Sequence, residues 1–340
     1  MPPQHHPYES LPVPSDAPFT LKPSGPGKGW GAFATRSIER GTVILRETAV
    51  FAIPKHQADI TELDVRAAFR KAPPAAQRQF LALRDNAAGP FRSMAKAFAE
   101  NSFAIGASVE RRGAHGFFPL LSRFNHSCVP NAAVPILHDA PKDSPAIYAT
   151  RDIAAGEEIM FRYDPHFECR TAIEHHEALD FVCDCPACRP GTEFQRASDL
   201  RRRLIRGLQF LVSGEGPAAS QGGSTSASAN IIPDPGVRKE VAEFRTPLSA
   251  QLIYNLLTVC LMEAEGILDE FEVGRLQPGF TAMATMFRRP RNASIARRAM
   301  AQSTPTERLR VAFALYGRAD EADEEMARVL RAMQGVSLAG

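Results

Sequence analysis

Three cysteines stand within six positions near the middle of the chain, in the sequence Cys183-Asp-Cys185-Pro-Ala-Cys188. Thiolates at this spacing are typical zinc ligands, and a structural zinc site takes four ligands in a tetrahedron. One ligand is therefore missing, and the candidates are Cys128, Cys169, His166, His175, His176 and Cys260. The rival interpretation is a chance grouping of three free thiols. The segment has little apolar core of its own, so we expect its fold to depend on a bound metal.

The spacing of the cysteines alone does not identify the fourth ligand. We interpret Cys260 as a buried small hydrophobic residue, because it lies on the apolar face of an expected helix. His175 and His176 lie among glutamates, where solvated histidines are more common than ligands. Cys128 precedes Pro130 in a turn and is free to point at a cluster.

The composition limits which partners the protein can have and in which compartment it is expected. The 40 Lys and Arg nearly balance the 38 Asp and Glu, so no overall field draws the chain to nucleic acid or to an anionic membrane. Six cysteines in 340 residues are too few for a disulfide scaffold. The N-terminus has no secretory pattern, and no apolar run is long enough to span a membrane. We expect a soluble protein of the nucleus or cytoplasm that requires no direct nucleic-acid binding.

Hydrophobic periodicity changes along the chain and predicts its organisation. Short β-rich runs bounded by turn residues are expected at Gly31–Thr35, Thr42–Arg46, Ala49–Ile53, Ile136–His138, Ala146–Thr150 and Glu158–Arg162. Helical spacing appears in an insert at about 58–101, broken at Pro73-Pro74, and in a basic amphipathic segment at 195–212. The predicted divisions are a Pro-rich disordered arm (1–18), an α+β domain of small sheets (19–165), a cysteine loop (166–190) and a helical C-terminal domain (191–340) with a flexible Gly/Ser/Ala-rich loop at 214–230.

One pattern, Thr-Arg-x-Ile-x-x-Gly-x-x-Ile, occurs at 35–44 and again at 150–159. Glycine tolerates the positive φ that tight turns need. We therefore predict that the chain turns at Gly41 and at Gly156 between two short strands, and that one hairpin design is used twice.

The glycine-dense stretch GPGKGWGAF at 25–33 matches neither the dinucleotide fingerprint nor the P-loop, although glycine would let the backbone approach a ligand closely. The order of the pieces is more informative: GKGWGAF, ENSFAIG, RFNHSCVPN, GEEIMFRYD and FVCDCPAC. Over about residues 19–190 this order resembles a SET-domain protein lysine methyltransferase, most closely the SET and MYND domain subfamily. The stretch where that subfamily carries its MYND zinc finger, near 50–100, contains no cysteine, so the chain looks like a relative without the finger, as in fungal SET-domain proteins.

The resemblance implies a SET-domain fold with a helical insertion and a zinc-bound post-SET loop, followed by a helical domain. It also implies a protein that transfers methyl groups from S-adenosylmethionine to a lysine of a histone or another protein. Such an enzyme must favour the neutral lysine amine, whose free pKa is near ~10.4, and must align it with the donor.

The resemblance further implies roles for single residues. Tyr163 is similar to the catalytic tyrosine, and Phe161 occupies the channel position that governs how many methyl groups are added; phenylalanine there favours di- or trimethylation. The implied cofactor-binding residues are Lys28, Gly29, Trp30, Asn101, Asn125, His126, Tyr163 and Phe181. The implied zinc ligands are Cys128, Cys183, Cys185 and Cys188.

Three other functions compete with this one. An inactive SET-fold scaffold or chromatin adaptor would share the motifs, although Asn125, His126 and Tyr163 argue for activity. A structural zinc protein could act through its basic helical tail, at Arg201–Arg203 or 288–298, but such runs are more often solvated helix faces. A hydrolase using His126 and Cys128 is disfavoured, because neighbouring residues in a turn rarely hold nucleophile and base in mutual reach.

Overall fold

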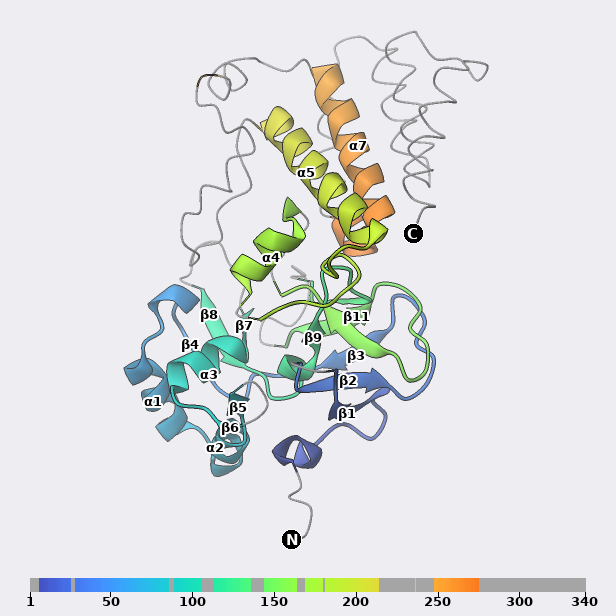
Figure 1. Ribbon diagram of the computed structural model, residues 1–340. Helices are drawn as coiled ribbons and strands as arrows, with labels where there is room; N and C mark the ends of the chain where they lie inside the picture. The colour runs from blue at the N-terminus through green and yellow to red at the C-terminus, as the bar shows by residue number, and fades with distance from the viewer. Residues whose placement is uncertain are drawn as a thin grey trace. The chain divides into compact units, whose positions relative to one another are not determined.

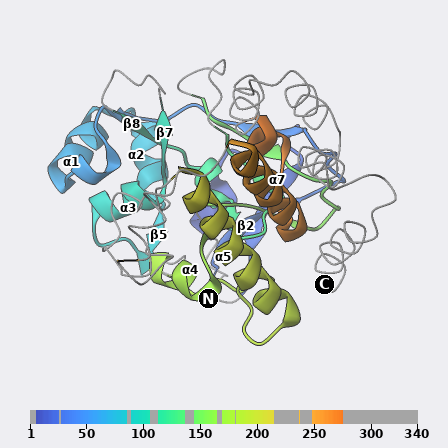
Figure 2. The same ribbon diagram turned by 90° about the horizontal axis from the view of Figure 1, so that it is seen from above.

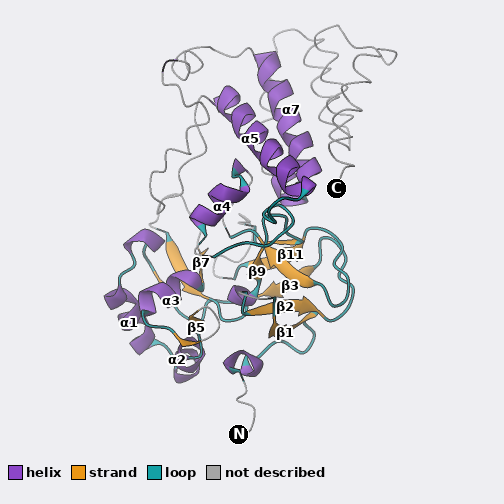
Figure 3. Cartoon of the chain, in the orientation of Figure 1, coloured by secondary structure: helices purple, strands orange, loops and turns teal. Residues whose placement is uncertain are grey.

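The computed structural model describes residues 6–25, 28–85, 89–105, 113–135, 144–163, 169–179, 181–213, 236 and 248–274. The chain divides into two compact units, Met1–Tyr163 and Asp164–Gly340. All named strands belong to the first unit, and the described part of the second is built from helices and loops (Figure 3). None of the helices described is both long and apolar enough to cross a membrane.

The strands of the first unit form small sheets (Figure 1). The four-stranded sheet has the order β1 (Phe19–Pro23), β2 (Trp30–Ala34), β12 (Glu158–Phe161), β9 (Asn125–His126). A second sheet has the order β10 (Ala132–Ala133), β11 (Ala146–Ala149), β3 (Val43–Arg46), and a third has the order β4 (Ala52–Ile53), β8 (Ala114–Phe117), β7 (Ser102–Ile105). In the fourth sheet, β5 (Arg84–Asp85) pairs with β6 (Gly89–Pro90). The β12–β9 pairing is parallel, and the other strand pairings are antiparallel. Parallel neighbours need a crossover, so β9 and β12 come together from distant sequence.

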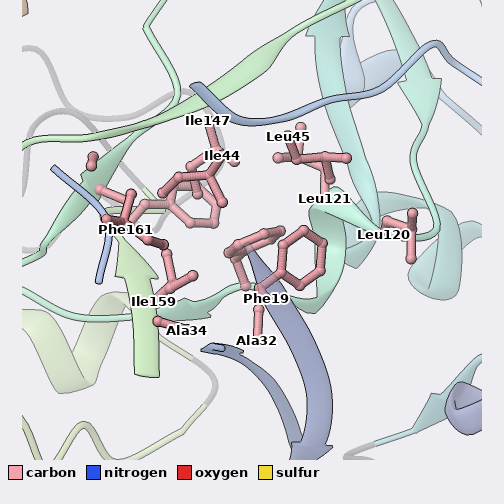
Figure 4. Packing of buried hydrophobic residues seen from close by; sticks show 14 of the residues in the cluster. Phe19, Ala32, Ala34, Ile44, Leu45, Leu120, Leu121, Ile147, Ile159 and Phe161 are labelled. Atoms are coloured by element: carbon pink, nitrogen blue, oxygen red, sulfur yellow. The ribbon is translucent and has the colours of Figure 1, made fainter. Parts of the chain in front are cut away.

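The main core of this unit lies among the first two sheets and the turn before β9. Figure 4 shows Phe19, Ile147 and Ile159 directed toward one another, with Leu121 nearby. Alternate residues of β12 are buried, as expected of a strand with one face on a core. Phe161 belongs to this core, so the channel residue implied by the resemblance is held by packing on several strands.

The expected helical insert is present as three helices, α1 (Glu62–Lys71), α2 (Pro74–Leu81) and α3 (Met94–Glu100). Thr61 and Asp64 form a capping box at the start of α1, and the helix ends before the two prolines, as predicted. These helices enclose a second core with β4 and β8, which includes Phe80, Phe98 and Phe117.

The repeated motif turns at its glycines, as predicted, with φ of 82° at Gly41 and 84° at Gly156. The prediction of two hairpins is wrong. β2 and β3 lie in different sheets, and so do β11 and β12, so each copy carries the chain from one sheet to the other. The two copies instead pair with each other through Ile38 and Ile153, which exchange backbone hydrogen bonds of 2.9 Å.

The N-terminal segment also departs from expectation. Residues 7–10 form a 3-10 helix, η1 (Pro7–Ser10), and Tyr8 is only 2% exposed within the main core, joined there by Leu11. The composition predicts disorder because so few apolar residues are present, but one aromatic ring in a core is enough to anchor a short segment. Residues 1–5 lie outside the described residues.

The second unit contains α4 (Ala172–Ala178), α5 (Glu193–Ser213) and α7 (Leu248–Glu265). Figures 1 and 2 show α5 and α7 side by side. Arg201 and Arg202 are buried, and their Nε atoms lie 2.6 and 2.8 Å from the carboxylate oxygens of Glu265, which is also buried. These two arginines are therefore neither a solvated face nor a basic patch, and the interpretation of the run fails for them.

Several predicted segments lie outside the described residues. They are the strand at 136–138, the loop at 214–230, the basic run at 288–298 and the helices expected after residue 274.

Candidate active site and metal centre

The parallel pair of β9 and β12 brings the Asn-His motif beside the tyrosine. Asn125 pairs with Met160 and His126 with Phe161, and the backbone N–H of Tyr163 donates to His126 Nδ1 at 3.2 Å. The His126 and Tyr163 ring centroids are 5.2 Å apart. Asn125, His126 and Tyr163, which span 38 positions of the sequence, thus lie in one corner of the first unit.

Both hydrogens of the Asn125 amide nitrogen are used inside the protein. Nδ2 donates to Glu158 Oε1 at 2.7 Å and to the Trp30 carbonyl at 3.3 Å. Ser24 Oγ donates to the same carboxylate at 2.7 Å, so Glu158 connects the end of β1 to β9. The amide orientation is therefore fixed, and Oδ1 is the acceptor end of the Asn125 side chain.

Gly31 makes this arrangement possible. A Cβ at this position would lie 2.3 Å from Glu158 Oε1 and 2.8 Å from Asn125 Nδ2, closer than non-bonded atoms approach. Glycine is required here for space and not for a positive φ. Just before it, Gly29 has φ 68°, and its carbonyl accepts from the Ser24 N–H at 2.7 Å. Lys28 and Trp30 flank Gly29, so the glycine stretch forms a tight turn next to Asn125.

The His126 ring is fixed on both sides. Because Nδ1 accepts from Tyr163, the ring proton is on Nε2, which donates to Cys128 Sγ at 3.2 Å. Cys128 Sγ thus has a hydrogen-bond donor from His126 beside it. The structure does bring His126 and Cys128 within hydrogen-bond reach, contrary to the expectation from sequence, but the protonated Nε2 faces the sulfur and cannot act as a base toward it.

Tyr163 is 46% exposed, and its hydroxyl donates to the Phe124 carbonyl at 3.2 Å. Desolvation of the hydroxyl raises the pKa of Tyr163 to about 12. The phenol therefore stays protonated at physiological pH and acts as a donor. Phe161 packs against it with ring centroids 5.1 Å apart, and Phe103 lies 5.8 Å from Phe161 on the other side.

Asn101 is 5% exposed and bonded on both ends of its amide. Its Oδ1 accepts from Arg123 Nη2, and its Nδ2 donates to the Ala97 carbonyl at 2.8 Å. Arg123 Nη2 also donates to Ser122 Oγ. Asn101 thus holds the arginine that stands two positions before Asn125 in the sequence.

Glu47 is a further residue of this region that carries no sequence signal. Its carboxylate accepts the backbone N–H groups of Leu120 at 3.1 Å and Leu121 at 2.7 Å, and so holds the turn that leads to Arg123. Burial raises the pKa of Glu47 to about 7, against the lowering effect of these bonds and of Arg123. Sequence reasoning likewise missed Ser24 and Glu158, because no motif spacing connects residues so far apart.

Four buried cysteines form a group that could hold a metal ion. They are Cys128, Cys183, Cys185 and Cys188, and their Sγ atoms all lie within 4.8 Å of one another. Tetrahedral zinc with Zn–S near 2.3 Å places its sulfur ligands about 3.8 Å apart, so the donor set and its spacing fit zinc.

The neighbouring histidines are not solvated, contrary to the interpretation from sequence. His175 is fully buried, with Nδ1 3.5 Å from Cys188 Sγ, and His176 Nε2 lies 3.1 Å from the Cys183 carbonyl. Both histidines lie beside the cysteine loop, where they would be outer-shell partners of a bound metal. Among the other candidate ligands, Cys169 donates to Gln209 Oε1 at 2.9 Å, Cys260 is half-buried on α7, and His166 lies outside the described residues. Phe181 is 37% exposed in the second unit.

Comparison with known proteins agrees with this geometry. Residues 29–164 match the SET domain family. Over 185 residues the chain is 33% identical to "Histone-lysine N-methyltransferase set5" of Schizosaccharomyces pombe, covering 53% of this chain and 54% of that protein. It is 37% identical over 86 residues to human "Protein-lysine N-methyltransferase SMYD4", covering 24% of this chain and 10% of that protein.

A third relative is "Histone-lysine N-methyltransferase ATXR4" of Arabidopsis thaliana, 35% identical over 88 residues, which cover 24% of this chain and 26% of that protein. The chain thus spans about half the length of the fission-yeast relative and less of the others. Residues 29–164, which match the family, contain Gly29, the Asn125–His126 strand and Tyr163. Residues 29–164 are thus the part of this chain that is similar to the SET domain family.

Proposed function

We propose that this protein is an S-adenosylmethionine-dependent protein lysine N-methyltransferase that modifies a histone or another protein. The observation that carries the proposal is the parallel β9–β12 pairing, which sets the strand of Asn125 and His126 alongside β12 and brings the His126 ring to 5.2 Å from the Tyr163 ring. The names of the relatives, all lysine methyltransferases, point to the same chemistry. The histone-directed names support action in the nucleus.

S-adenosylmethionine supplies an electrophilic methyl group, and the protein has to hold this donor and present a neutral lysine amine to it. Asn125 Oδ1 suits an ammonium or amino group, because both hydrogens of its Nδ2 are already used. The turn at Lys28, Gly29 and Trp30 lies beside Asn125 and offers backbone close to a ligand. Asn101 acts here through Arg123, and Phe181 is proposed to add an aromatic surface for the cofactor.

Tyr163 is the catalytic residue in this proposal. Its raised pKa keeps the hydroxyl protonated, and the bond to the Phe124 carbonyl fixes the direction of that hydrogen, so the oxygen lone pairs can orient an incoming amine. Phe161, packed against Tyr163 and buried in the core, forms a wall of the lysine channel. Phenylalanine at this wall leaves room for a methylated amine, which favours di- or trimethylation.

The four cysteines are proposed to hold one zinc ion with a structural role. Four buried thiols with histidines in the outer shell suit this metal, and zinc leaves no open position in such a set for catalysis.

The proposal is tested with the purified 340-residue chain, S-adenosylmethionine and a cell extract, with methyl-lysine detected by mass spectrometry. Tyr163→Phe removes one hydroxyl and is expected to lower methyl transfer by about 100-fold or more. Tyr148→Phe is the matched control, because Tyr148 lies in β11 and bonds Arg46 at 3.3 Å, outside the site. Equal methylation by wild type and Tyr163→Phe would refute the role of the tyrosine. Absence of methylation, with cofactor binding retained, would indicate a scaffold.

A further inference from the structure

The N-terminal segment joins three separate parts of the first unit through one side chain. Tyr8, in η1, is almost fully buried, and its hydroxyl accepts the backbone N–H of Arg84 at 3.0 Å, 76 positions away. Ordering a segment of this kind costs conformational entropy for each residue, so its contacts have to offset that cost. The contacts are made with residues next to the proposed cofactor pocket.

The first of these residues is Trp30, at the end of the glycine turn. The His6 ring stacks on the indole at 4.6 Å between centroids and 19° between planes, and Tyr8 meets the indole edge-on at 6.4 Å and 87°. The side chain of Trp30 therefore has aromatic rings of the N-terminal segment as neighbours. Its carbonyl, in turn, accepts the bond from Asn125 Nδ2.

The second is Arg123, whose guanidinium lies 4.3 Å from the centre of the Tyr8 ring. A cation over an aromatic face is attracted to it, more strongly where water is excluded. Arg123 is buried and donates to Asn101 Oδ1, and it stands two residues before Asn125. Tyr8 thus contacts both Trp30, whose carbonyl bonds Asn125, and Arg123, which bonds Asn101.

We propose that Tyr8, with support from His6, is a positioning residue for the S-adenosylmethionine pocket. It holds the Trp30 indole and the Arg123 guanidinium in the orientations from which the glycine turn, Asn101 and Asn125 are organised. The inference rests on the proposed function, since it assigns the pocket to that cofactor. The N-terminal segment is thereby part of the binding site, although none of its residues belongs to a SET motif.

The experiment measures binding of S-adenosylhomocysteine to the 340-residue chain by calorimetry, together with the fluorescence of Trp30, its single tryptophan. Tyr8→Ala removes the ring and is expected to weaken binding about tenfold, to raise the KM for S-adenosylmethionine and to leave kcat at saturating cofactor within about twofold. The Trp30 emission should shift in the free protein. Tyr8→Phe keeps the ring and should restore affinity to within about twofold of wild type.

Leu11→Ala is the control for a merely structural role. Leu11 is buried in the same core, so its truncation destabilises the protein while the Tyr8 ring stays in place. Its cofactor affinity should match wild type. If Tyr8→Ala does not fold, His6→Ala decides the matter. This change removes the stacked ring of a half-buried residue and the Nδ1 that accepts the Tyr8 N–H at 3.2 Å, so weaker binding with shifted Trp30 emission supports the inference.

Unchanged affinity in Tyr8→Ala, or in His6→Ala where that variant decides, refutes the inference and leaves the proposed function intact. Tighter binding also refutes it, because the segment would then obstruct the pocket. Failure of the wild-type chain to bind either cofactor form overturns the proposed function itself, and with it the basis of the inference.

Discussion

Glu47 should make the stability of the first unit depend on pH. Its carboxylate lies just after β3 and accepts backbone N–H groups of Leu120 and Leu121, which start the turn toward Arg123. Burial raises the pKa of Glu47 from 4.5 to about 7, and the two backbone bonds and Arg123 offset only part of this effect. Desolvation therefore dominates at this position.

The direction of the pH effect follows from the raised pKa. Between pH 4.5 and about 7 the folded protein binds the Glu47 proton more tightly than the unfolded chain does, so protonation stabilises the fold. The contribution is fully present at low pH and is lost as pH rises through these values. Linkage gives a loss of about 2.5 kcal/mol in the free energy of unfolding between pH 5 and pH 8.

Urea unfolding at pH 5, 6, 7 and 8, followed through Trp30, measures the effect, because the only tryptophan lies in the same unit as Glu47. Glu47→Gln has no proton to exchange, so the stability of wild type minus that of Glu47→Gln should fall by about 2.5 kcal/mol across this range. Glu39→Gln, at an exposed position, should follow the wild-type profile. A difference between wild type and Glu47→Gln that stays constant from pH 5 to 8 would refute the reasoning.

Three further predictions concern the other parts of the molecule. Gly31→Ala places a Cβ 2.3 Å from Glu158 Oε1, so cofactor binding by calorimetry should weaken by about tenfold, and binding equal to wild type would contradict the steric argument. Glu265→Gln leaves two buried arginines without their carboxylate and should cost about 3 kcal/mol in unfolding measured by circular dichroism. Glu263→Gln, at an exposed position of the same helix, is the control, and equal losses would argue against a buried ion network. Cys185→Ser should reduce the zinc content found by metal analysis from one ion per chain and lower the melting temperature, whereas full zinc retention would exclude Cys185 as a ligand.

Local chemistry made much of this protein predictable. The turns at Gly41 and Gly156, the helix break at Pro73-Pro74 and the thiol loop each depend on residues a few positions apart. The positive φ of glycine, the missing N–H of proline and the spacing of cysteine ligands are properties of a short segment, so they can be predicted from the sequence. The order of motifs added the resemblance to the SET domain family, which residues 29–164 also match.

Other features depend on partners far along the chain. The composition of the N-terminal arm predicts disorder, yet Tyr8 is anchored by Arg84, 76 positions away. The basic run reads as a solvated face, yet Arg202 pairs with Glu265, 63 positions away. The residues of a segment do not reveal whether a distant part of the chain will bury its polar groups and supply their hydrogen-bond or ion-pair partners.

The sequence by itself determined the helical insert, its break at Pro73-Pro74 and the turns at Gly41 and Gly156. Only the tertiary structure decided that β9 lies parallel to β12, that Glu158 fixes the Asn125 amide, and that the His126 proton faces Cys128. The physical reason is that hydrogen-bond direction and burial are set by the neighbours that packing supplies, and in this fold those neighbours come from opposite ends of the domain, as Ser24 and Glu158 do across 134 positions.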